Sequence, residues 1–145
     1  MKGFEGIYRG KRRDNGEWVH GYYIGDCGDG CHEICDINAA LAPRIEVDPE
    51  TVGVSIGVRD MYGRAIYTGD LIRSSKAVML SGVTFRVDYN ADIASFMARA
   101  VGESERVRWT PCLNYGTMKT YEVIGNIYDN PAEAGEYEQI CIGGI

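Results

Sequence analysis

Residues 52 to 73 decide the fold, and they read Val52-Gly-Val-Ser-Ile-Gly-Val-Arg-Asp-Met-Tyr-Gly-Arg-Ala-Ile-Tyr-Thr-Gly-Asp-Leu-Ile-Arg73. The first half alternates apolar residues with small ones, at Val52, Val54, Ile56 and Val58. This period of two is typical of a strand with one buried face. Gly63 and Gly69 are expected in turns at positive φ, where a Cβ would clash. The segment therefore predicts strands and tight turns at the centre of a mainly β protein.

Two aspartates, Asp60 and Asp70, lie at these turns. Aspartate in a turn commonly accepts hydrogen bonds from nearby backbone amides. We therefore interpret both carboxylates as structural parts of the turns and not as catalytic groups.

The N-terminal third predicts a second hairpin. Asn15-Gly16 separates the segment that begins at Phe4 from the strand at residues 17–24. Asn-Gly is a strong hairpin signal because both residues tolerate the left-handed backbone of a tight turn. The glycine-rich and aspartate-rich residues 25–36 are expected to form a loop leading into a short strand.

The C-terminal half contains two clear strands, at residues 83–89 and 121–128. Residues 93–101 fit two patterns, because the same apolar side chains form a helical stripe or an alternating strand. Residues 107–109 are compatible with a short strand. The tail has room for a short helix at 132–138 and an edge strand at 139–145.

Length and composition are those of an ordinary globular protein. The 145 residues suit a single domain, which can be divided into subdomains at 1–51 and 52–145. No apolar stretch approaches the roughly 18 residues that a membrane-spanning helix needs. The beginning of the chain lacks the apolar run of a secretory signal. We therefore expect a cytoplasmic protein with no membrane contact.

A basic cluster near the N-terminus is the main candidate for contact with a nucleic acid or an acidic partner. It consists of Arg9, Lys11, Arg12 and Arg13. The net charge of −6 disfavours nucleic-acid binding by the chain as a whole, because phosphate contacts supply most of the non-specific affinity. The alternative interpretation is a solvated flank of the hairpin turn.

A second candidate site contains Cys27, Cys31, His32 and Cys35. Thiolates and imidazole bind Zn²⁺ tetrahedrally, so four such groups within nine residues supply enough ligands. Structural zinc sites usually combine ligands from two separate segments, whereas these lie in one loop. The competing interpretation is a set of reduced cysteines, and we expect no cofactor.

No catalytic motif is present. The sequence lacks a Gly-x-Ser-x-Gly nucleophile elbow, a phosphate-binding glycine loop and a zinc-protease helix. Cys31 and His32 are neighbours, which in a strand point to opposite faces. We therefore expect a protein that is not an enzyme.

Three segments, taken in order, resemble the YopX-like family of phage and prophage proteins. They are residues 9–22, residues 60–73 and residues 121–131. The chain departs from the family pattern at Ser55-Ile-Gly-Val-Arg59, where an aromatic residue, a Thr and a Gly-Leu usually precede the Asp. Each segment alone is a common β-turn pattern, whereas the ordered set is specific.

The resemblance implies a mainly β fold with SH3-like barrel elements built from hairpins and with little helix. It implies a phage or prophage origin and a strand, in place of a helix, at residues 95–101. It implies no activity. We expect an accessory protein that acts as a binding module or associates with itself through its strand edges. Nucleic-acid binding by the basic cluster and zinc stabilisation remain the alternatives.

Overall fold

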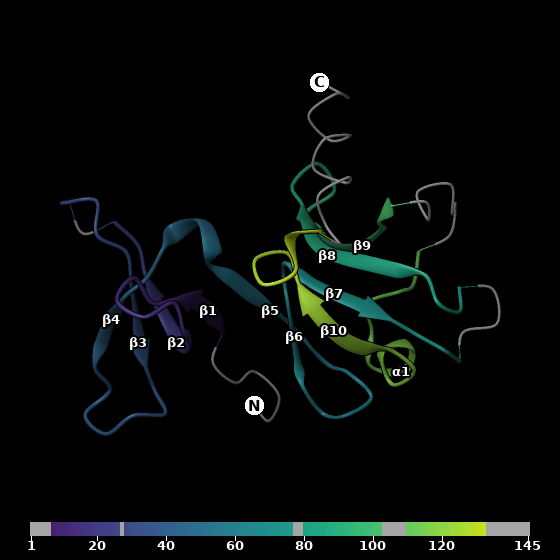
Figure 1. The fold of residues 1–145 in the computed structure, drawn as a ribbon, viewed down its shortest axis with the longest axis horizontal. Coiled ribbons are helices and arrows are strands. Elements are labelled where there is room, and N and C mark those ends of the chain that lie inside the picture. Colours follow the sequence, from purple (N-terminus) through teal and green to yellow (C-terminus); the bar gives the residue numbers. More distant parts are fainter. Residues whose placement is uncertain (1–6, 27, 77–79, 103–109, 133–145) are drawn as a thin grey trace. The chain divides into compact units, whose positions relative to one another are not determined.

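The structure is a computed structural model that describes residues 7–26, 28–76, 80–102 and 110–132. The described strands are β1 (Tyr8–Lys11), β2 (Trp18–Ile24), β3 (Glu33–Asp36), β4 (Arg44–Glu46), β5 (Gly53–Arg59), β6 (Ala65–Tyr67), β7 (Asp70–Arg73), β8 (Thr84–Asn90), β9 (Ser95–Ala100) and β10 (Glu122–Asn126). They form one sheet in the order β4-β3-β2-β1-β5-β6 and another in the order β10-β7-β8-β9 (Figure 1). The mainly β fold is thus confirmed.

The described strands form no closed barrel, so the SH3-like barrel elements that the resemblance implies remain an expectation. A barrel needs a partner for every strand edge. The outer edge of β10 is instead occupied by side chains, because the amides of Val123 and Asn126 donate to Asp60 and Asn130. Two open antiparallel sheets result.

The chain divides into two compact units, Met1–Gly57 and Val58–Ile145, and the division falls within β5. The first unit contains a small core of Val19, Ile34 and Val47, against which partly buried side chains pack. The core of the second unit is larger and contains Ile66, Tyr67, Leu71, Ile72, Phe85, Val87, Ala98, Ala100, Val101, Met118 and Tyr121.

The predicted N-terminal hairpin is formed by β1 and β2, with Lys11 opposite Trp18. Gly16 takes a positive φ of 72°, whereas Asn15 is not among the non-glycine residues with positive φ. Asn15 acts through its side chain, whose Oδ1 accepts the amide of Glu17 at 2.9 Å. The hairpin was therefore predicted correctly, but only one of its two turn residues adopts the left-handed backbone.

The alternation expected in β5 is less clean than predicted. Ser55 and Gly53 are buried, whereas Val54, Ile56 and Val58 are only partly buried. Val54 pairs with Tyr8, and the Ser55 amide donates to the carbonyl of Ile7. Both faces of this strand are covered in part, so it does not have one buried and one solvated face.

The segment at 95–101 is a strand, as the resemblance implies. Along β9, Ala98 pairs with Val87 and Ala100 pairs with Phe85, and both alanines are buried in the core. Ala94 turns the chain with a φ of 50°, and Ile93 is 60% exposed. The helical stripe was misleading because its first member, Ile93, lies outside the core.

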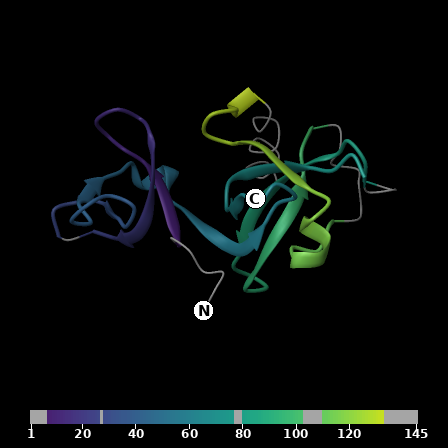
Figure 2. The same ribbon diagram turned by 90° about the horizontal axis from the view of Figure 1, so that it is seen from below.

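Helix α1 (Tyr115–Met118) was not expected. The side chain of Asn114 caps its N-terminus by accepting the amide of Thr117, and Met118 is fully buried. The helix directly precedes β10 along the chain (Figure 2). The strand expected at 107–109, the helix expected at 132–138 apart from the helical Ala132, and the edge strand expected at 139–145 lie outside the described residues.

No helix in the described part of the chain is both long enough and apolar enough to span a bilayer.

Candidate functional site

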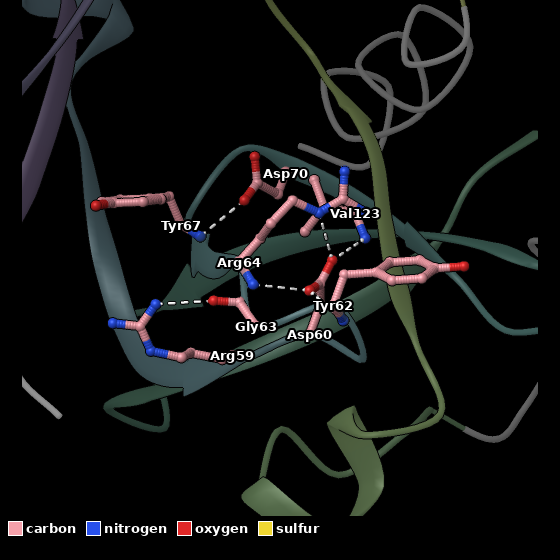
Figure 3. A network of polar contacts seen from close by, with 8 residues as sticks. All are labelled: Arg59, Asp60, Tyr62, Gly63, Arg64, Tyr67, Asp70 and Val123. Carbon is pink, nitrogen blue, oxygen red and sulfur yellow. Dashed lines mark hydrogen bonds and ion pairs between the residues drawn. The ribbon is translucent and has the colours of Figure 1, made fainter.

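The Asp60 turn is a densely bonded polar site of the second unit (Figure 3). The Asp60 carboxylate accepts the amides of Tyr62 and Arg64 at 2.9 Å each and the Arg64 guanidinium at 2.9 Å. It also accepts the amide of Val123, which is 63 residues away in sequence, at 3.0 Å. One carboxylate thus ties the turn to β10.

Burial of Asp60 acts to raise its pKa, but the opposing hydrogen bonds win. The amides of Val123, Arg64 and Tyr62 and the Arg64 guanidinium together lower the pKa below its ordinary value. Asp60 therefore stays ionised at neutral pH. An ionised carboxylate with this many fixed donors is a structural anchor, and it has no proton to supply to a reaction.

Asp70 plays a similar part at the next turn. It is 1% exposed, and its carboxylate accepts the amide of Tyr67 at 2.8 Å. Gly69 has a φ of 89°, its amide donates to Val87, and its carbonyl accepts from Ile127. These turn residues hold strands together, which agrees with a structural role.

A different kind of site lies on one face of β1 and β2, which we call the Trp18 face. It consists of Arg9, Lys11, Trp18, His20 and Tyr22. The register places Arg9 opposite His20 and Lys11 opposite Trp18, so these side chains share a face. The opposite face, which carries Val19, packs into the small core. Neither β1 nor β2 contains a carboxylate.

Trp18 brings the two cations together. The Arg9 guanidinium lies 4.6 Å and the Lys11 ammonium 5.4 Å from the centre of its ring. Such cation–π contacts orient the charged groups. Arg9 is buried, whereas Tyr22 is 53% exposed. The face therefore combines preorganised positive charge with an exposed aromatic ring.

His20 contributes a neutral ring at physiological pH. Its burial, together with the positive charge of Arg9, lowers its pKa below the ordinary value, and Asp36 opposes this only in part. A neutral imidazole can stack and can form hydrogen bonds without adding charge.

The structure separates the predicted basic cluster. Arg12 binds Asp14 through two hydrogen bonds of 2.9 and 2.7 Å, and Arg13 lies 3.4 Å from Glu46. Their charges are balanced locally. Arg9 and Lys11 are brought together on the Trp18 face, while Arg12 and Arg13 lie at the hairpin turn.

The residues of the Cys/His loop have separate contacts. Cys35 Sγ donates to the carbonyl of Ala42 at 3.2 Å, and the Tyr23 hydroxyl and His32 Nδ1 share a hydrogen bond. Cys35 is not part of a disulfide bond, and Cys27 lies outside the described residues. Among the residues that the structure describes, no group of three or more His, Cys, Asp or Glu side chains is arranged to hold a metal.

The two open antiparallel sheets define a class of small β folds to which a solved structure is similar. The crystal structure of protein EF1440 from Enterococcus faecalis matches with a TM-score of 0.52 and covers 86% of this chain and 94% of that chain. The sequences are 18% identical, so this likeness shows the fold alone.

The YopX protein family model matches residues 7–133, and the chain belongs to this family. The resemblance seen in the sequence is thereby confirmed. No curated protein matches the chain.

The Trp18 face could have been found from the sequence. A hairpin turn at 13–16 pairs residues 9 and 11 with residues 20 and 18, so the register follows from the turn. Grouping the basic residues by their closeness in sequence obscured this face. Arg9 and Lys11 lie on it, whereas Arg12 and Arg13, at the hairpin turn, pair with carboxylates.

Proposed function

We propose that this YopX family member is a non-enzymatic binding module, encoded by a phage or prophage, that holds an anionic partner on its Trp18 face. The supporting observation is the placement of Arg9 and Lys11 over one tryptophan ring, next to the exposed ring of Tyr22. Complementary charge favours an acidic partner at such a face.

Local neutralisation explains how an acidic chain can carry such a site. Glu33 of β3 comes onto the same face through its pairing with Ile24, and it lies 3.4 Å from Arg44. Charges farther away than about 10 Å are largely screened at ordinary ionic strength. The overall charge of −6 therefore opposes binding less than the two nearby cations support it.

Retention on immobilised heparin, used as a generic polyanion, tests this function. The chain should be retained at low salt, and Lys11→Ala should elute at lower salt. Lys119→Ala is the matched control, because Lys119 also lies over an aromatic ring, 4.3 Å from that of Tyr115, but in the second unit. Absence of retention, or an equal effect of both variants, would refute the proposal.

Self-association is a second candidate, favoured by an exposed apolar patch at the β8–β9 turn. The rings of Tyr89 and Phe96 pack edge to face with centroids 5.4 Å apart, and Tyr89 and Ile93 are 54% and 60% exposed. Exposed aromatic and aliphatic clusters mark protein interfaces. In a dimer, this patch of one copy can pack against the same patch of the second copy.

Analytical ultracentrifugation over a range of concentrations tests this association. The chain should form dimers or larger species that Ile93→Glu dissociates. Leu41→Glu is the control, because Leu41 is fully exposed in a loop of the first unit. A monomer at all concentrations would rule out the self-association.

A further inference from the structure

We propose that the anionic partner of the Trp18 face is a single-stranded nucleic acid, whose bases stack on Tyr22 and His20 while a phosphate contacts Lys11. This inference rests on the proposed function and names the ligand class of the same site.

The spacing of the aromatic side chains along β2 supports this class. Trp18, His20 and Tyr22 alternate with inward-facing residues and therefore project from one face. Their attachment points are about 6.6 Å apart, a step that one nucleotide of an extended strand can bridge. The row thus presents consecutive rings to consecutive bases.

The three rings of this row have different roles. The Trp18 ring already lies against two cations and holds them in position. Tyr22 is 53% exposed and His20 is partly buried and neutral at pH 7, so both rings are suited to stacking. Stacking on aromatic side chains is the usual way in which proteins hold single strands without reading their sequence.

One cation, Lys11, lies beside the aromatic row, where a phosphate can contact it. Lys11 belongs to β1, the strand beside the aromatic row, so a nucleic-acid strand that follows β2 keeps its backbone next to Lys11, while the buried Arg9 adds positive charge without a direct contact. Bases in a duplex are paired and stacked and cannot present their faces to a sheet. A single strand therefore fits this arrangement better than a duplex does.

Fluorescence anisotropy with the full chain tests the inference. The probes are a labelled oligothymidylate and a labelled oligouridylate of about a dozen nucleotides, a size that suits one small β module. A duplex of equal length and polyglutamate serve as competitors. Either single strand should bind more tightly than both competitors. The two probes distinguish DNA from RNA as the source of the ligand.

Variants link the binding to the named side chains. Tyr22→Ala should weaken binding at least about five-fold, the loss expected for one stacked base, whereas Tyr22→Phe keeps the ring and should bind normally. The control Tyr62→Ala removes a tyrosine that is 65% exposed in the second unit and should have no effect. One phosphate contact predicts a slope of log K against log salt of about −0.7, which Lys11→Ala should bring close to zero.

The outcomes separate this inference from the function on which it rests. Equal binding of duplex or polyglutamate, or full affinity in Tyr22→Ala, would overturn the assignment to single-stranded nucleic acid. If heparin retention then persists and still depends on Lys11, the anion-binding function stands and only the ligand class is wrong. If the unmodified chain is not retained on heparin, both the anion-binding function and the assignment to single-stranded nucleic acid are refuted.

Discussion

The two units of the chain use charged side chains in opposite ways. In the second unit, Asp60 and Asp70 are buried, and their carboxylates accept backbone amides that end or join strands. In the first unit, Arg9 and Lys11 lie over Trp18 on a sheet face whose opposite side contains a core of three buried residues. Buried carboxylates anchor turns in the second unit, whereas in the first unit two cations gather over one tryptophan ring.

This difference indicates where function can vary without loss of the fold. A large core and anchored turns make the second unit the main source of stability, whereas the small core of the first unit supports a face on which side chains can be exchanged. Surface changes away from buried networks usually alter stability by less than about 0.5 kcal/mol. We therefore expect substitutions in the two units to separate stability from binding.

The largest effect is expected for Phe85→Ala in the second unit. Phe85 is fully buried and packs edge to face on Tyr121. Loss of the ring should lower the free energy of unfolding by about 3 to 5 kcal/mol. Urea denaturation measures the change, with Tyr89→Ala on the exposed end of the same strand as the control. A loss below 1 kcal/mol for Phe85→Ala would contradict the importance given to this core.

Asp60→Asn should have the next largest effect, about 2 to 3 kcal/mol, because an amide keeps some hydrogen bonds but loses the charge-assisted ones. Thermal denaturation measures the change. Asp92→Asn, at an exposed turn, is the control. Equal stability of the two variants would show that the Asp60 network is dispensable.

The same carboxylate predicts an acid dependence. Because the pKa of Asp60 is lower in the folded state, its contribution to stability is fully present above the unfolded value of 3.8. That contribution is lost as pH falls through the lower folded value. The stability difference between the chain and Asp60→Asn should therefore shrink below pH 3.8. A difference independent of acid would refute this linkage.

Gly69→Ala should cost about 1 to 2 kcal/mol, because an L-residue at positive φ is strained. An added Cβ would also lie 3.2 Å from Cε2 of Tyr128. Gly116→Ala is the control, since that glycine lies in α1 without a positive φ, and alanine favours helix there. Calorimetric melting of both variants should give changes of opposite sign. A stabilised Gly69→Ala would contradict the turn geometry.

The smallest effect is expected from His20. Its pKa is lowered in the folded state, so below pH 6.5 the unfolded chain binds the proton first and stability falls. The fall ends once pH passes below the folded pKa. His20→Gln should remove this part of the pH dependence and leave stability at pH 8 nearly unchanged. An identical pH profile for both proteins would show that burial and the positive charge of Arg9 do not lower the pKa of His20.

Most of the fold could be predicted because strand alternation and turn chemistry are local properties. The turns at Gly16, Gly63 and Gly69 have the positive φ that their residues permit. Residues 93–101 could not be assigned by period alone, since the helical and strand patterns share Phe96 and Ala100. Pairing with β8 resolves this segment, and pairing is a long-range property.

For the candidate site, the sequence alone determined which residue types are present and that Lys11 and Trp18 flank a hairpin turn. Only the tertiary structure decided which charges are balanced by carboxylates, as Arg12 is by Asp14, and which share the ring of Trp18. Likewise, an aspartate in a turn is evident from sequence, but the bond from Asp60 to Val123 spans 63 residues. Turn preferences act between neighbours, whereas such contacts exist only after the sheets have formed.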